Sequence, residues 1–229
     1  LAIQSASVST VSPIFHPFRQ AGGSAFTEVA GNNDVQRISY YTPSFNGLTV
    51  GVSYAPDAST NASNSGGTNF NTVGLKNVFD LGVNYSQSFG TTDVSVGARY
   101  GTGDNNNATA SDPETWGIGA QVGFGAFTVG GHYAENDNGA AGGNAGVINA
   151  PAGAPTAAGT LGATVAAADQ SGYGFGVTYD VAGPWAVGFE GFMGEADVSS
   201  ITGAGDAEYN AYKLAGSRSL GTGVSWDVY

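Results

Sequence analysis

The sequence predicts an all-β protein, a transmembrane antiparallel up-and-down β-barrel, and three observations support that prediction. Apolar and polar residues alternate along most of the chain, tight turns and long loops follow one another in turn, and charged residues are scarce. Only 10% of the 229 residues are charged, against about 25% in a soluble globular protein. A soluble domain with this composition would have an unusually uncharged surface.

The alternation predicts about ten strands, the first of which begins at Gln36. Successive side chains of a strand point to opposite faces, so each alternating segment has one apolar and one polar face. In the segment 78–87, Phe79 and Leu81 share the apolar face and Asp80 lies on the polar one. The other expected strands cover 48–55, 93–100, 115–124, 127–134, 171–180, 185–194, 207–218 and 222–229. Within 207–218 the phase stays open, because Lys213 and Arg218 fall on opposite faces.

The connections between these strands alternate in length. Short ones are expected at 43–47, 88–92, 125–126, 181–184 and about 219–221, and long ones at 56–77, 101–114, 135–170 and 195–206. Short periplasmic turns and long extracellular loops are the plan of an outer-membrane barrel. Aromatic residues close the strands at both ends, as interfacial girdles do. They are Tyr54, Tyr100 and Tyr133 before long loops, and Phe45, Phe89, Phe124, Phe127, Tyr179 and Trp185 at short turns.

Several other classes of protein fit the sequence less well. A soluble β-sandwich or a secreted adhesin also alternates, but its solvent face should carry many charges, whereas the polar face here is mostly Gly, Ser, Thr, Asn and Gln. No stretch approaches the roughly 20 apolar residues of a membrane helix. The net charge of −12 disfavours a nucleic-acid partner, and the absence of cysteine excludes thiolate sites. We expect any signal peptide to have been removed.

The segment 37–54, Arg-Ile-Ser-Tyr-Tyr-Thr-Pro-Ser-Phe-Asn-Gly-Leu-Thr-Val-Gly-Val-Ser-Tyr, resembles the strand, turn and strand after the constriction loop of general diffusion porins from α-proteobacteria. The likeness covers 36–229 well, and it covers 1–35 by position only, as the inward-folded third loop. It implies a 16-stranded homotrimer in the outer membrane of a Gram-negative bacterium. The ten readable strands would then be the sixth to the fifteenth, with both termini truncated.

This resemblance implies a water-filled channel for passive diffusion of small hydrophilic solutes and ions, with outer-membrane lipid and lipopolysaccharide as surroundings. Two other functions stay open: a substrate-specific channel, and a structural or adhesive barrel with a closed lumen whose loop 135–170 binds a partner. We expect no catalytic residues. The glycines of 172–176 lie inside an alternating strand, and no G-x-S-x-G elbow occurs. With only His16 and His132 in the sequence, a zinc site of the H-E-x-x-H type is impossible. A Ser-His-Asp set at the rim is the remaining enzymatic alternative.

A channel selects ions by charges at its narrowest point, so the candidate site consists of charged residues on the polar face. The expected basic side is Arg37, Arg99, His132 and Lys213, and the expected acidic side is Glu28, Asp34, Asp80, Asp180 and Glu190. The resemblance adds weight to Arg37, because a basic residue after the third loop commonly faces the acids of that loop. The alternative for each is an ordinary solvated charge in the lumen.

Two further expectations concern glycine and calcium. Gly172, Gly174 and Gly176 face the lumen, where they make room for a folded loop or ease strand bending. No cofactor is expected. Asp104 with Asn105–Asn107, and Glu135 with Asp137, supply the oxygen ligands that calcium takes, but neither fits an EF-hand loop. Solvated surface loops that face lipopolysaccharide are the favoured interpretation of these residues, and bound calcium is the alternative.

Overall fold

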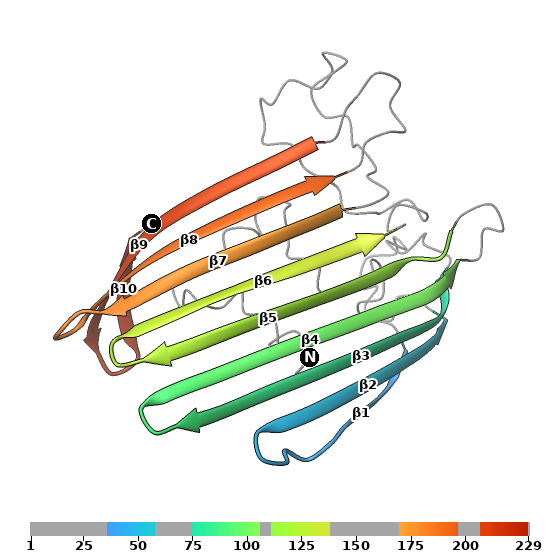
Figure 1. Cartoon of the computed structure of the whole chain (residues 1–229), viewed down its shortest axis with the longest axis horizontal. Coiled ribbons are helices and arrows are strands. Elements are labelled where there is room, and N and C mark those ends of the chain that lie inside the picture. The colour runs from blue at the N-terminus through green and yellow to red at the C-terminus, as the bar shows by residue number, and fades with distance from the viewer. Residues whose placement is uncertain (1–35, 58–74, 106–110, 138–169, 197–206, 229) are drawn as a thin grey trace.

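The computed structural model describes residues 36–57, 75–105, 111–137, 170–196 and 207–228, and these residues form one antiparallel sheet. Its ten strands lie side by side in chain order (Figure 1). They are β1 (Ile38–Tyr41), β2 (Leu48–Asp57), β3 (Leu75–Phe89), β4 (Thr92–Asn105), β5 (Glu114–Phe124), β6 (Phe127–Asp137), β7 (Gln170–Asp180), β8 (Trp185–Ala196), β9 (Ala207–Gly221) and β10 (Val224–Val228). The predicted fold class, an up-and-down antiparallel β structure, is confirmed.

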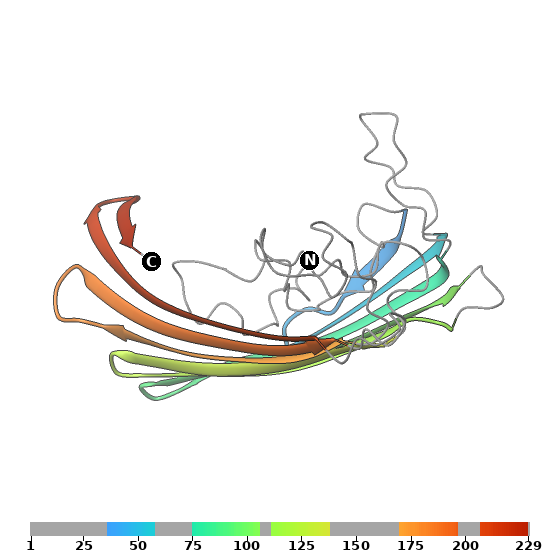
Figure 2. The same cartoon turned by 90° about the horizontal axis from the view of Figure 1, so that it is seen from above.

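The sheet is strongly curved, and from above it has the shape of a trough (Figure 2). Curvature of this kind follows from the twist of a large antiparallel sheet and is what closes a barrel. The described strands form an open sheet, with β1 and β10 as its two end strands. No helix among the described residues is long and apolar enough to cross a membrane.

The two faces of the sheet differ as the alternation predicts. We call the face with Asp80 the inner face and the face with Phe79 the outer face. Apolar side chains of the outer face are well exposed, for example Ile118 at 52% and Leu214 at 74%, whereas Asp80 and Glu190 of the inner face are buried. Large exposed apolar side chains suit a surface that contacts lipid.

Aromatic side chains gather at the short-turn end of the outer face. The rings of Phe124, Phe127 and Tyr179 contact one another in a row, with centroid separations of 5.8 and 4.6 Å. At the long-loop end, the hydroxyls of Tyr54, Tyr100 and Tyr133 donate hydrogen bonds to Asn77, Glu114 and Glu135, respectively. Both aromatic groups therefore lie at the ends of the strands, where interfacial rings are favoured.

A positive-φ glycine stands in each short turn. The five are Gly47, Gly90, Gly125, Gly183 and Gly223, with φ between 58° and 102°. Non-glycine residues rarely adopt this conformation, and it matches the twist that tight hairpins need. At Gly47 a side chain would also collide with the backbone carbonyl of Ser86.

The strands are longer than the alternation predicts, and the extra residues lie mainly at the long-loop end. The segments expected as loops at 101–114 and 135–170 include the last residues of β4 and β6, up to Asn105 and Asp137. The strands stay paired at these last residues of β4 and β6 although both faces are polar there. Beyond the apolar band that contacts lipid, water can solvate either face of the sheet. The turn expected at 219–221 is also shifted: β9 continues to Gly221, and the turn is Thr222–Gly223.

The register of β9 resolves the phase that the sequence left open. Lys213 lies opposite Glu190 of β8, so its position belongs to the inner face. Arg218 lies opposite Trp185, and its guanidinium carbon is 5.1 Å from the centre of that ring, so Arg218 belongs to the outer face. The alternation of β9 therefore runs unbroken, with one basic residue on each face.

Candidate functional site

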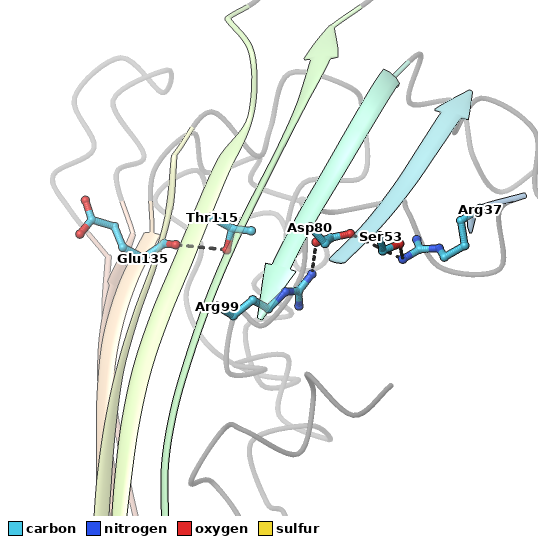
Figure 3. Close-up of polar contacts among 6 residues, drawn as sticks. All are labelled: Arg37, Ser53, Asp80, Arg99, Thr115 and Glu135. Atoms are coloured by element: carbon cyan, nitrogen blue, oxygen red, sulfur yellow. Dashed lines mark hydrogen bonds and ion pairs between the residues drawn. The ribbon is translucent and has the colours of Figure 1, made fainter. Parts of the chain in front are cut away.

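Two arginines joined by one carboxylate lie on the inner face, and we call them the Arg–Asp–Arg cluster. Arg37 directly precedes β1, Asp80 belongs to β3 and Arg99 belongs to β4. Arg99 Nη2 is 2.6 Å from Asp80 Oδ1, and Arg37 Nη1 is 3.5 Å from Asp80 Oδ2 (Figure 3). Arg37 also donates a 3.3 Å hydrogen bond to the hydroxyl of Ser53. Each oxygen of Asp80 therefore faces one guanidinium, and all four side chains project from the same side of the sheet.

Strand register explains why these residues meet. Asp80 on β3 lies directly opposite Ser53 on β2, so the Ser53 hydroxyl is beside the carboxylate that Arg37 approaches. Arg99 on β4 lies opposite two glycines, Gly82 on β3 and Gly117 on β5. With no side chain on either neighbour, the arginine can lie along the sheet and reach diagonally to Asp80.

The cluster holds one more positive than negative charge. The Asp80 side chain is 4% exposed, that of Arg99 11% and that of Arg37 29%. A buried carboxylate is costly unless charge and hydrogen-bond partners compensate it, and here two guanidiniums do so. The arginines are in turn held against the wall, and the more exposed Arg37 is the one that solvent reaches.

This arrangement differs from the one expected from the sequence. Asp80 was expected on an acidic side that faces Arg37 and Arg99 across a space, but it lies between the two arginines on the same wall. Alternation correctly assigns all three residues to the inner face. It carries no information on the stagger between strands, which decides which inner-face side chains touch.

Glycines flank other ionisable residues of the inner face as well. His132 on β6 lies between Gly119 on β5 and Gly174 on β7 in the register, and Glu190 on β8 lies opposite Gly176. A methyl group at Gly174 would collide with Cε1 of the His132 ring. Gly174 therefore provides the space for the His132 imidazole, which lies across the neighbouring strand. This role differs from the two expected from the sequence, which were room for a folded loop and easier bending of the strand.

Gly174→Ala tests this role of the glycine. We expect it to lower the free energy of unfolding by about 1–3 kcal/mol, the usual cost of forcing extra atoms into a filled site. The midpoint of heat-induced conversion from folded to unfolded migration on gels measures the effect. The control is Gly123→Ala, also on the inner face, where the added methyl group meets its nearest neighbours at 3.7 Å. Equal losses for both variants would contradict the role assigned to Gly174.

Two other expected site residues, Asp180 and Glu190, lie on strands away from the cluster. Asp180 is exposed at the short-turn end of β7, and its backbone N–H donates to the Ala126 carbonyl. Glu190 is 6% exposed on β8, opposite the Lys213 position. Glu28 and Asp34 lie outside the described residues. The assignment of these residues to a constriction stays a prediction.

Two polar contacts were not expected from the sequence. The Ser53 hydroxyl belongs to the cluster, and the buried Thr115 hydroxyl donates to the backbone carbonyl of Glu135, whose carboxylate points away from the cluster (Figure 3). Both residues lie on the polar face of their strands, as the alternation predicts. The alternation does not distinguish them from the other polar-face residues. The Glu135 carboxylate accepts a hydrogen bond from Tyr133 instead.

The calcium alternative gains no support from the described strands and turns. There, no group of three or more His, Asp and Glu side chains is arranged to hold a metal ion. Asp104 accepts a 2.7 Å hydrogen bond from the Asn77 amide. Asn106 and Asn107 of this candidate ligand set lie outside the described residues, so the alternative stays untested.

Known proteins show a clear likeness to this chain. A family model described as Gram-negative porin matches residues 4–229. No curated protein matches the chain by sequence. Among solved structures, Salmonella typhi OmpF in complex with daunomycin superposes with a TM-score of 0.57 at 15% identity, covering 83% of this chain and 52% of that one.

Two other channels superpose similarly. Pseudomonas aeruginosa OccK8 (OprE) has a TM-score of 0.52 at 12% identity, with 82% and 52% of the two chains covered. The outer-membrane channel DcaP of Acinetobacter baumannii has a TM-score of 0.52 at 9% identity, with 84% and 54% covered. The chain thus spans about half the length of the solved structures it matches, and it shares their fold.

Proposed function

Because the chain belongs to the Gram-negative porin family, we propose that it forms part of the wall of a water-filled channel through which small hydrophilic solutes and ions diffuse passively. The family is one of outer-membrane proteins, which agrees with the exposed apolar outer face. The observation that carries the proposal is the inner face, where ionisable side chains lie among glycines on a wall otherwise lined by small polar residues.

We propose that the Arg–Asp–Arg cluster is the basic side of the constriction. Arg37 and Arg99 would attract anions and orient dipolar solutes, while Asp80 positions both guanidiniums and offsets one of their charges. His132 and Lys213 are further basic candidates. On the acidic side we propose Glu28, Asp34, Asp180 and Glu190, with 1–35 as the inward-folded loop.

The complete protein would close the open sheet with further strands that pair with β1 and β10, because unpaired edges cannot stand in hydrocarbon. We propose that it is a 16-stranded homotrimer, with short turns in the periplasm and long loops outside, surrounded by lipid and lipopolysaccharide. Passive diffusion needs no catalytic step, so we propose no enzymatic activity.

Liposome swelling with the full-length protein tests passive diffusion. We expect swelling rates that fall smoothly with solute size and do not saturate with concentration. A substrate-specific channel would instead show a swelling rate that saturates with the concentration of one sugar, amino acid or anion. The same solute would block the ion conductance of the channel in a planar bilayer. A closed structural or adhesive barrel would leave the liposomes impermeable, and that result would overturn the proposal.

A further inference from the structure

The outer face of β8 to β10 carries a row of one arginine between two tryptophans. Trp185, Arg218 and Trp226 are successive cross-strand neighbours in the register. The Arg218 guanidinium stacks over the Trp185 ring at 5.1 Å, and the two indole rings meet edge to face at 6.3 Å. The guanidinium thus lies over one ring in the geometry of a cation–π contact, and the second ring packs against the first.

This row lies at the short-turn end of the sheet and faces outward. Trp185 is the first residue of β8, and the Ser219 N–H next to Arg218 donates to the carbonyl of Pro184 in the turn. Trp185 is 40% exposed, Trp226 is 52% exposed, and Arg218 is also exposed. Tryptophan on the outer face of a barrel marks the level of the lipid headgroups, so Arg218 stands at that level.

Among the side chains that the structure describes, no carboxylate forms an ion pair with Arg218. Asp80, the carboxylate that bridges Arg37 and Arg99, lies on the inner face. Among the described Lys and Arg residues, Arg218 is also the one at the short-turn end of the strands. An exposed guanidinium at the headgroup level is accessible to an anionic partner from outside the sheet.

We propose that Trp185, Arg218 and Trp226 form a binding site for the phosphate of an anionic phospholipid in the leaflet at the short-turn end. Guanidinium binds phosphate through paired N–H donors, while the indole rings fill the space beside the glycerol backbone and the upper acyl chains. The proposal rests on the outer-membrane location of the family and not on conduction through the pore.

Native mass spectrometry of the full-length protein tests the site, with phosphatidylglycerol, phosphatidylcholine and inorganic phosphate as separate probes. We expect preferential retention of phosphatidylglycerol and an approximately five-fold loss of that retention in Arg218→Gln, the size typical of one basic residue at an anionic membrane surface. Arg218→Lys should keep part of the binding, because it preserves the charge and loses the planar stack.

The matched control is Lys76→Gln, which removes a positive charge at the opposite, long-loop end of β3 and should leave retention unchanged. Three outcomes would overturn the proposal. They are equal retention by wild type and Arg218→Gln, displacement of the lipid by millimolar inorganic phosphate, and loss of subunit assembly in Arg218→Gln with lipid retention unaltered. The last would assign Arg218 to a contact between copies of the chain. Folding of each variant is checked by its heat-modifiable gel migration.

Discussion

Replacing Asp80 with Asn should make the full-length channel more selective for anions. The substitution keeps the shape of the side chain and removes the one negative charge from between Arg37 and Arg99. Two unit charges about 4 Å apart in water interact by about 1 kcal/mol, so we expect the anion-to-cation permeability ratio to rise by about five-fold. The reversal potential in a tenfold KCl gradient across a planar bilayer measures the change.

A second variant separates the charge of Asp80 from its role in holding the arginines. Asp80→Glu keeps the charge and lengthens the side chain, so the selectivity should stay close to wild type while the current noise rises as the guanidiniums become less fixed. Asp93→Asn is the control, since Asp93 is exposed at the short-turn end of the same β4 strand as Arg99. If Asp93→Asn shifts the reversal potential as much as Asp80→Asn does, the cluster is not the part of the pore wall that sets the ion selectivity.

The double variant Arg37→Gln/Arg99→Gln should shift selectivity in the opposite direction and by more. It removes two positive charges and leaves the buried Asp80 as the charge of the cluster. We expect the permeability ratio to move toward cations by roughly ten-fold or more, because the sign of the local charge reverses. The same bilayer measurement checks this, with Lys76→Gln as a single-charge control at the rim.

Loss of both arginines also leaves a buried carboxylate without its charge partners, which is strongly destabilising. We therefore expect the double variant to unfold at lower temperature than wild type. The triple variant with Asp80→Asn should recover most of that stability and an intermediate selectivity. A triple variant as unstable as the double one would show that Asp80 is not the group the arginines compensate.

Alternation in the sequence was sufficient to predict the ten strands and the face to which most charged residues belong. It succeeds because a sheet with lipid on one side and water on the other needs apolar and polar residues in strict turn. Phe79 and Asp80 illustrate this. They are adjacent in the sequence, yet Phe79 is exposed on the outer face and Asp80 is buried on the inner face. The tight turns were also readable, apart from the last, where Thr222–Gly223 was placed too early.

Contacts within the inner face could not be predicted, because they depend on the stagger between strands. Arg99 meets Asp80 only because its direct neighbours across the sheet are glycines, and these positions follow from pairing that alternation does not specify. The ambiguity at Arg218 has a different origin. A charge on the apolar face looks like an error in phase until the adjacent Trp185 shows that the position lies at the interface.

Single-channel recording of the full-length protein in a planar bilayer tests the central claim most directly. The proposed water-filled channel predicts large, steady, ohmic steps that arrive in groups of three, as expected from a trimer with one pore in each subunit. Insertion of folded protein without any steady conductance step would contradict the channel and leave a closed barrel whose function lies in its loops.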